Sequence, residues 1–309
     1  MITSDLDLTN FRFSGHESFP CRYAWLPKAF GVLDRDPSTF ADMEQSMVHL
    51  GVGKNMFNAI RFWVQVIDIA ESLQQGGYRI TDFGRALLGR FDPFLEDIRT
   101  LWLIHWKIAT HNEKPLFAWH YLLYSWYHPE FSRREAINAF QKEVAKSNRN
   151  LSPITLAQHF DIFLHTYVPT RGSQGDVQED NLDCPLVELE LIHKIGETAR
   201  DKTGKRESIY AFRFEEKPEV TPALFIYCLD DFWNKYHTNE LTLSFRDIAF
   251  GQGSPGQVFK LPEWDIRQRL DSMEQDSNGL FSYQESTILQ QVVRSNVADN
   301  DLLAPIYSE

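Results

Sequence analysis

The stretch Leu50–Trp63, LGVGKNMFNAIRFW, decides the first part of the fold. The residues before it, Phe40–His49, are predicted to form a helix. Gly51 and Gly53 then predict a tight turn. A second helix follows the turn, and its polar positions carry lysine, asparagine and arginine side chains. The stretch therefore predicts two helices that are joined by a short glycine-containing turn.

The next segment, Gly76–Leu88 with the sequence GGYRITDFGRALL, predicts a hairpin and a further helix. The glycine pair at its start marks the bend, and Tyr78–Ile80 is the returning strand. Thr81 then caps a helix over Asp82–Leu88. Helix, turn, helix and hairpin in this order are typical of winged-helix domains, in which one helix faces the major groove of DNA.

The second helix carries donors of the kind that phosphate oxygens and base edges accept. The alternative is a solvated face of a surface helix, because Phe57, Ile60 and Val64 form an apolar stripe at spacings of three and four. The residues alone leave both interpretations open. The candidate DNA contacts of this unit are Lys54, Asn55, Asn58, Arg61 and, on the returning strand, Arg79.

The composition limits how such a contact can work. The chain has 309 residues, a formal net charge of −12 at pH 7, 43% hydrophobic residues and 14% aromatic residues. This apolar content is enough for a packed core and excludes a disordered chain. The negative charge argues against non-specific coating of nucleic acid or of an anionic membrane. A DNA contact must therefore be a local basic patch, and its affinity must depend strongly on salt or on a partner.

The three cysteines, Cys21, Cys184 and Cys228, are widely separated and match no zinc or disulfide spacing. The first ten residues lack the basic and apolar regions of a secretory signal. Charged side chains interrupt the most apolar windows, so no window is expected to span a bilayer. These features predict a soluble protein of the reducing cytoplasm.

The predicted fold class is mainly α with small β structure. Residues 1–170 are expected to form an N-terminal domain that combines the winged-helix unit with a helical middle. The polar stretch 171–183 is the expected hinge. Residues 184–309 are the expected C-terminal domain, in which 243–281 repeat the order helix, turn, helix and strand. This repeat predicts a second winged-helix-like unit.

Two features of the helical middle predict local structure. Its tryptophans, among them Trp102 and Trp119, recur at helical spacing among leucines and isoleucines. This pattern favours packing in the core over stacking on splayed bases. Ser152 before Pro153 marks the start of a helix over Pro153–Tyr167.

Several blocks of the sequence together resemble a family of bacterial proteins that is catalogued as a domain of unknown function. Members of that family occur in gene clusters for DNA phosphorothioation. A weaker likeness, GSPGQVFKL, lies nearer the C-terminus. The main blocks, in order, are GHESFPCRYAWLPKAF, LGVGKNMFNAIRFW, LWLIHWKIATH, FLHTYVP and EDNLDCPLVELELI.

The resemblance implies a role in sulfur modification of DNA. In those systems a cysteine desulfurase and an ATP-dependent sulfur-transfer protein replace a non-bridging phosphate oxygen with sulfur. The likeness is greatest to the DNA-nicking component of the single-strand system. It therefore implies a DNA-binding partner of these two enzymes, which opens or engages the backbone for sulfur insertion. It transfers no catalytic residue to this sequence.

Hydrolysis of a phosphodiester needs an activated water and positive charge near the phosphoryl oxygens, which a metal held by carboxylates commonly supplies. His16, Glu17 and Arg22 are the catalytic candidates. A helix over Phe19–Phe30 would place the first two at its N-terminal end, where phosphate binding is favoured. The alternative is a buried, hydrogen-bonded histidine beside a glutamate that only caps the helix.

The candidate metal site uses carboxylates, which Mg²⁺ prefers as ligands. Its alternative is a solvated linker in which one aspartate caps the following helix. No spacing of a nucleotide-binding loop, a metalloprotease or a restriction-type nuclease occurs in the sequence. The candidate Mg²⁺ ligands are Glu17 and, in the hinge, Glu179, Asp180 and Asp183.

Other basic residues are secondary candidates for DNA contact. One lies inside the tryptophan-rich block, where it either reaches a phosphate or extends along apolar surface. Two begin a basic helix that either contacts the DNA backbone or is a solvated face. Three belong to a turn that is a candidate wing tip. These residues are, in order, Lys107, Arg133, Arg134, Lys202, Lys205 and Arg206.

The lead hypothesis is a DNA-binding protein of a phosphorothioate-modification and antiphage defence system that nicks DNA in a metal-dependent reaction. The first alternative is a non-catalytic adaptor that recognises DNA and recruits the sulfur-transfer enzyme, which the acidic composition favours. The second alternative is a transcription regulator of the same gene cluster, which would bind one promoter tightly.

Overall fold

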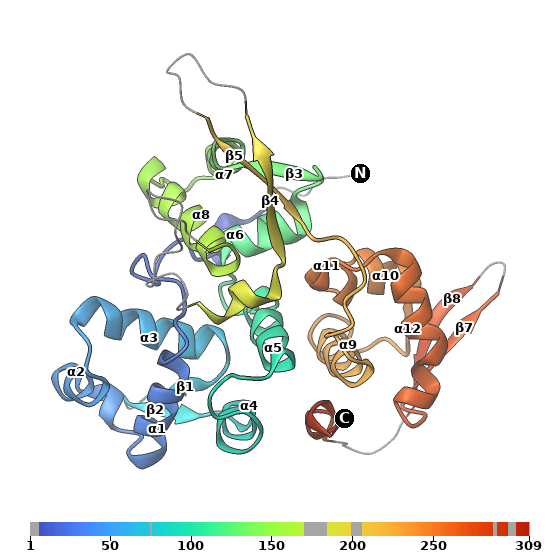
Figure 1. Cartoon of the computed structure of the whole chain (residues 1–309), viewed down its shortest axis with the longest axis horizontal. Helices are drawn as coiled ribbons and strands as arrows, with labels where there is room; N and C mark the ends of the chain where they lie inside the picture. The colour runs from blue at the N-terminus through green and yellow to red at the C-terminus, as the bar shows by residue number, and fades with distance from the viewer. Residues whose placement is uncertain are drawn as a thin grey trace. The chain divides into compact units, whose positions relative to one another are not determined.

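The protein is mainly helical with small antiparallel sheets, as the sequence predicts. It forms two compact units, Met1–Phe212 and Arg213–Glu309 (Figure 1). The first unit holds every candidate site residue of the described part of the chain. The structure is a computed structural model, which describes residues 6–74, 76–169, 184–198, 206–286, 289–295 and 301–308.

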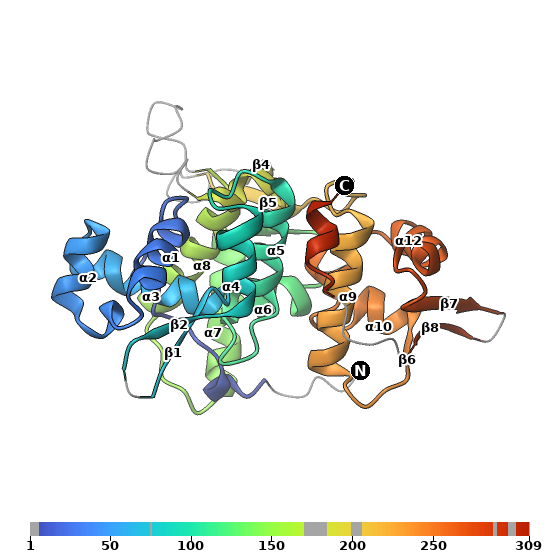
Figure 2. The ribbon, with the colours of Figure 1, turned by 90° about the horizontal axis from the view of Figure 1, so that it is seen from below.

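The first unit begins with helices and one hairpin. Helices α2 and α3 meet at a short turn, and the β1–β2 hairpin follows α3 directly (Figure 2). The element order over this part is therefore the predicted one. The elements are η1 (Leu8–Asn10), α1 (Trp25–Arg35), η2 (Thr39–Ala41), α2 (Met43–Leu50), α3 (Lys54–Val66), β1 (Ala70–Ser72), β2 (Tyr78–Ile80), α4 (Asp82–Ala86) and the π-helical turn η3 (Leu87–Phe91).

Local side-chain chemistry sets these boundaries. Helix α2 begins three residues later than predicted, because the Asp42 side chain accepts the N–H groups of Glu44 and Gln45. Gly51 ends the helix with φ 68°, a conformation that glycine adopts without strain. Thr81 caps α4 by accepting the N–H of Gly84, as predicted.

The prediction of a helix over residues 19–30 is wrong in its first part, because α1 begins at Trp25. The Phe19 carbonyl accepts a hydrogen bond from Trp63 Nε1 at 3.0 Å instead of serving a helical turn. Glu17 and Ser18 also have left-handed backbone angles, with φ 49° and 61°. Residues 14–19 therefore form a loop over α3, and not the first turn of a helix.

The rest of the first unit adds helices and a three-stranded sheet. Strand order in the sheet is β3-β5-β4, and all pairs are antiparallel. Helix α8 has the predicted bounds, and Ser152 caps it by accepting the N–H of Thr155. The elements are α5 (Ile98–Ala109), α6 (Phe117–His120), the π-helical turn η4 (Tyr121–Ser125), β3 (Glu130–Ser132), α7 (Arg133–Lys146), α8 (Pro153–Tyr167), η6 (Pro185–Leu189), β4 (Ile192–Glu197) and β5 (Ser208–Phe212).

The expected domain boundary differs from this division. Residues 184–212 are expected in the C-terminal domain, yet β5 pairs with β3 and η6 packs against α5 and α8. These residues therefore belong to the first unit. The expected hinge, 171–183, lies outside the described residues.

The core of the first unit is aromatic. Trp63, Trp102, Trp106 and Trp119 are fully buried, which confirms the core interpretation of the tryptophan-rich block. Trp119 Nε1 donates to the Tyr167 hydroxyl at 2.8 Å, so this buried polar group is satisfied. No described helix is long and apolar enough to cross a membrane.

The second unit is a helical layer with another three-stranded antiparallel sheet of order β6-β8-β7. Strand β6 and the short helix α11 were not predicted. The predicted order of helix, turn, helix and strand over 243–281 is present, with α10 and α12 as its helices and β7 as its strand. The elements are α9 (Pro222–Tyr236), β6 (Thr242–Ser244), α10 (Phe245–Phe250), α11 (Pro255–Phe259), α12 (Glu263–Asp276), β7 (Phe281–Glu285), β8 (Gln290–Arg294) and η7 (Ala304–Tyr307).

Candidate nucleic-acid interface

Helix α3 buries one face and leaves its polar face accessible. Its apolar side chains, including Phe57, Ile60 and Trp63, are fully buried. Because an α-helix repeats every 3.6 residues, the positions between them point outward. Two of these outward side chains are exposed and two are half-buried. We call this set the α3 surface; its residues are Lys54, Asn55, Asn58 and Arg61.

The cations of the α3 surface lack acidic partners among the described residues. No ion pair joins Lys54 or Arg61 to a carboxylate there. The Arg61 guanidinium lies over the Phe57 ring, 5.5 Å from its centroid. Its Nε–H is buried and meets no hydrogen-bond acceptor in the described part of the chain. The positive charge of this half-buried side chain is therefore not compensated by a described carboxylate, which favours an anionic ligand beside it.

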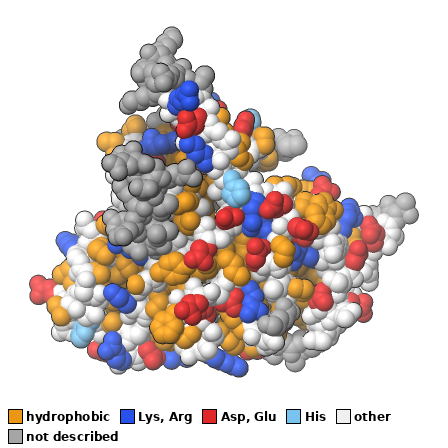
Figure 3. Space-filling view, viewed as in Figure 1, with side chains coloured by type: hydrophobic (Ala, Val, Ile, Leu, Met, Phe, Trp, Pro, Cys, Tyr) orange, Lys and Arg blue, Asp and Glu red, His pale blue; other side chains and the backbone are white. Residues whose placement is uncertain are grey.

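The other basic candidates that the structure describes are already paired. Four of them form ion pairs with carboxylates at exposed or half-exposed positions, and such pairs contribute little to stability. Lysine and arginine side chains are interspersed with aspartate and glutamate on the face shown in Figure 3. The four pairs are Arg79 with Glu71, Arg133 with Asp161, Arg134 with Glu207 and Arg206 with Glu197.

Lys107 is placed in the interior of the first unit. The residue is 8% exposed, and its Nζ lies 2.9 Å from Asp68 Oδ2 and 4.3 Å from the centroid of the Phe83 ring. This placement supports the structural alternative and not a phosphate contact. Lys202 and Lys205 lie outside the described residues.

His16 is buried against a second histidine. Its Nε2 lies 3.2 Å from Nδ1 of His159 on α8, and the two rings are nearly parallel. Its Nδ1 lies 3.2 Å from the backbone N of Ser18. Burial lowers the pKa of His16 to about 4, so the ring is neutral near pH 7. This placement supports the structural alternative for His16.

The two neighbouring candidates lie closer to the surface. Glu17 is exposed, and its backbone has the left-handed angle described above. Arg22 is half-buried, with its guanidinium 5.6 Å from the ring centroids of both Phe19 and Trp25. Because α1 begins at Trp25, neither His16 nor Glu17 lies at its first turn. The helix-terminus argument for phosphate binding therefore does not apply to them.

The described residues do not form a metal-binding set. No three of their histidine, cysteine, aspartate and glutamate side chains are grouped to hold an ion. Glu17 therefore has no described partners as a ligand. The other three candidates, Glu179, Asp180 and Asp183, lie outside the described residues.

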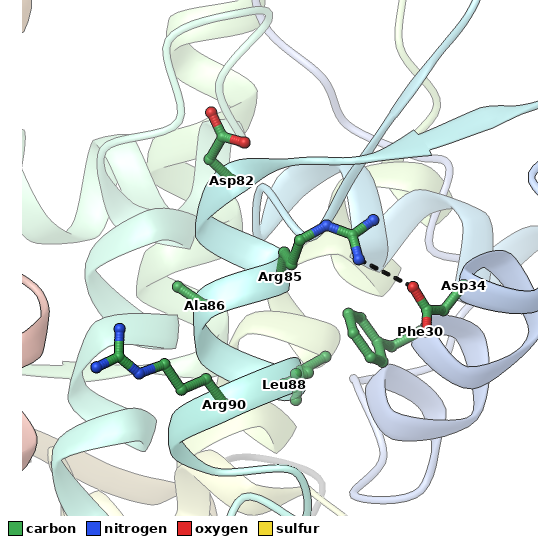
Figure 4. Close-up of a pocket in the computed structure, with 8 residues that line it drawn as sticks. Phe30, Asp34, Asp82, Arg85, Ala86, Leu88 and Arg90 are labelled. Atoms are coloured by element: carbon green, nitrogen blue, oxygen red, sulfur yellow. Dashed lines mark hydrogen bonds and ion pairs between the residues drawn. The ribbon is translucent and has the colours of Figure 1, made fainter.

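A shallow groove of about 550 Å³ lies between α1 and the α4–η3 segment (Figure 4). Arg85 points across it to Asp34, and the ion pair between them measures 3.0 Å. Phe30 lines the same side as Asp34. Arg85 is thus neutralised within the groove, and no residue of the α3 surface lines the groove.

Sequence reasoning missed two residues near the loop over α3. Arg12 is half-buried, and its guanidinium lies 5.9 Å from the centroid of the Phe62 ring. No described carboxylate pairs with it. Its backbone is held by hydrogen bonds to Pro115 and Phe117. His159 lies within the predicted helix over Pro153–Tyr167, and nothing local indicates its partner 143 residues away.

Comparison with known proteins supports the architecture. Two solved structures, titled "Magnesium ion-bound SspB crystal structure" and "SspB crystal structure", each match with a TM-score of 0.80. Each match has 24% sequence identity and covers 94% of this chain and 86% of the other. At this identity the likeness shows a shared fold. No curated protein matches the chain.

Residues 13–307 match a family model that is described as "Protein of unknown function (DUF4007)". The match covers nearly the whole chain. The protein therefore belongs to the DUF4007 family.

Proposed function

We propose that this protein is a DNA-binding component of a DNA phosphorothioation system. In this proposal α2, α3 and the β1–β2 hairpin act as a winged-helix unit, and the α3 surface contacts the duplex. The observation that carries the proposal is the accessibility of Lys54 and Arg61, which have no acidic partner among the described residues. The shared fold with SspB and the sequence resemblance to proteins of such systems support the assignment.

The position of each donor on α3 suggests what it contacts. Lys54 and Asn55 lie in the first turn, where free backbone N–H groups and the helix dipole favour a phosphate. Asn58 and Arg61 lie one and two turns further along the same helix. Amide and guanidinium groups at these positions suit base edges or a second phosphate. Few contacts against a net charge of −12 imply modest affinity and a strong salt dependence.

A gel shift with the full chain tests the DNA-binding part of the proposal. A labelled 20-base-pair duplex should form a complex that weakens steeply as salt rises. The same length of single-stranded DNA is the comparison. Absence of a complex at low salt on several unrelated duplexes would overturn the proposal. Tight binding to one promoter alone would instead support the transcription regulator.

We further propose that the protein nicks DNA, as the resemblance to the nicking component implies. One of the two matching structures is titled as magnesium-bound, which motivates assays with this ion. Supercoiled plasmid should convert to the open circular form with Mg²⁺ and not with a chelator. The Lys54→Ala variant should lose nicking together with DNA binding. Plasmid that stays supercoiled, with and without the sulfur-transfer proteins, would contradict this activity.

The second candidate function is a non-catalytic adaptor. The burial of His16 favours it, because it lowers the pKa of the ring to about 4 and so makes the ring a weak general base for an attacking water. The acidic helix α12 also favours it, because its exposed carboxylates suit a basic protein partner. The Glu17→Ala variant separates the two functions. Loss of DNA modification with unchanged DNA and partner binding supports catalysis, whereas loss of partner binding supports the adaptor.

A further inference from the structure

The loop Gly15–Ser18 is held on α3 by a buried histidine pair. A Cβ atom on Gly15 would lie 2.8 Å from the Phe62 ring, so only glycine lets the loop approach α3 this closely. His16 is 3% exposed and His159 is fully buried. Ser14, Gly15, Glu17 and Ser18 are exposed. The loop thus presents its backbone at the surface while its histidine lies beneath.

The hydrogen bonds of the pair require more acceptors than the rings possess. The N–H of Ala118 faces His159 Nε2 at 3.0 Å, and the N–H of Ser18 faces His16 Nδ1 at 3.2 Å. The inner contact between His16 Nε2 and His159 Nδ1 needs one proton and one lone pair. Together these contacts need three lone pairs. Two neutral imidazole rings have two lone pairs and two protons.

Burial determines which contact lacks its acceptor. Ala118 is fully buried, so its N–H cannot turn to water and must keep His159 Nε2 as acceptor. His159 then carries its proton on Nδ1 and donates it to His16 Nε2. His16 in turn carries its own proton on Nδ1. Two donors, His16 Nδ1–H and the N–H of Ser18, therefore face each other at 3.2 Å.

We propose that this pair of donors is an oxyanion subsite that binds a phosphate oxygen of the DNA backbone. A single oxygen placed beside the two nitrogens, about 2.9 Å from each, accepts both hydrogen bonds. The subsite extends the α3 surface and so rests on the proposed function. It gives His16 a role in holding phosphate through Nδ1 and not in proton transfer.

The surroundings of the loop favour an anion on one side and oppose it on the other. The Phe62 ring lies 5.8 Å from the His16 ring and 5.9 Å from the Arg12 guanidinium, so this cation lies beside the same aromatic ring. Phe62 follows Asn58 by one turn of α3, which makes the loop continuous with the α3 surface. The exposed Glu17 carboxylate opposes a free anion.

The tautomer of His16 tests the proposal without any variant. In the full chain labelled uniformly with ¹⁵N, the histidine ring ¹⁵N shifts should show both His16 and His159 protonated on Nδ1 at pH 7.5. A His16 ring protonated on Nε2 would overturn the proposal. Addition of inorganic phosphate, and separately of a 20-base-pair duplex, should shift the His16 Nδ1 and Ser18 amide signals. An absence of shifts with both probes would also overturn it.

Two substitutions of His16 distinguish the effect of the Nδ1–H donor from the effect of the size of the imidazole ring. Asn places its amide nitrogen near the position of Nδ1, whereas Gln places it near Nε2. His16→Gln should weaken duplex binding about tenfold, as expected for the loss of one hydrogen bond to a charged phosphate. His16→Asn should bind like the wild type. Equal affinities for the two variants would overturn the proposal.

A third variant tests the charge of the loop. Glu17→Gln should raise the affinity for inorganic phosphate several-fold, because it removes the nearest opposing charge. An unchanged or lower affinity would contradict the subsite.

The tests also distinguish failure of the subsite from failure of the proposed function. If Lys54→Ala weakens duplex binding and His16→Gln does not, DNA binding stands and the subsite fails. If phosphate shifts the loop signals but no duplex binds, the subsite stands and the proposed function fails.

Discussion

At the scale of single residues, the structure separates cations that are available to a ligand from cations that are already used. Lys54 and Arg61 have no acidic partner among the described residues, whereas Lys107 is enclosed between Asp68 and Phe83. The sequence shows a basic residue at all three positions. Only the three-dimensional arrangement shows which charge is free, because each partner comes from a distant part of the chain.

Lys107 should therefore matter for stability and not for DNA binding. Lys107→Ala removes a buried stem, an ion pair and a contact with an aromatic face, and should lower the free energy of unfolding by about 2 kcal/mol. Lys142→Ala makes the same charge change at an exposed position and should change it by less than about 0.5 kcal/mol. Urea unfolding and a gel shift measure the two effects. A selective loss of DNA affinity in Lys107→Ala would contradict this assignment.

The buried pair of His16 and His159 should make the free energy of unfolding depend on pH. Burial lowers the folded-state pKa of His16 to about 4, below the ordinary value of 6.5, so the unfolded chain takes up the proton first. The stabilisation is present above about pH 6.5 and is lost as the pH falls toward 4. Urea midpoints for the wild type and for His16→Asn should converge over this range. Parallel pH profiles for the two proteins would show that the pair makes no contribution.

At the scale of elements, local signals were predictable and distant pairings were not. Ser152 and Pro153 fix the start of α8, and Thr81 fixes the start of α4, because a cap acts on neighbouring backbone groups. Strand β3 was missed, because its partner β5 lies about eighty residues further along the chain. The start of α1 was misplaced for a related reason, since the Phe19 carbonyl bonds to Trp63 on α3.

In the candidate site, too, local features could be predicted from the sequence and contacts between distant residues could not. The exposed face of α3 could be predicted from the spacing of its apolar residues, because helix geometry alone determines it. The role of the loop before α1 could not be predicted, because it depends on His159 in a helix far along the chain. Arg12 was missed because its significance comes from the Phe62 ring beneath it.

The α2–α3 turn should tolerate little change at its glycine. Gly51 has φ 68°, so Gly51→Ala should lower the free energy of unfolding by about 1 kcal/mol even though the space around it is open. Gly31 lies within α1 with open space at its Cβ position and without a positive φ. Gly31→Ala should raise the free energy of unfolding by up to about 1 kcal/mol. Thermal or urea unfolding that gives both variants the same sign would contradict this account.

At the scale of the whole molecule, a net charge of −12 means that DNA binding must come from a local surface. The second unit has the same general order of helices and strands, but its helix α12 carries five carboxylates and two arginines. Both arginines are paired, Arg267 with Glu285 and Arg269 with Asp265. This helix would be repelled by a duplex, so the contact is assigned to the first unit.

The most direct test of the central claim is duplex affinity measured by fluorescence anisotropy across a range of salt concentrations. Lys54→Ala/Arg61→Ala should bind at least about tenfold more weakly than the wild type, and its dependence on log salt should fall by about two units of slope. Lys28→Ala/Lys142→Ala removes the same charge from exposed positions outside the α3 surface and should bind like the wild type. Equal affinities and equal slopes for the two double variants would contradict the claim that α3 holds DNA.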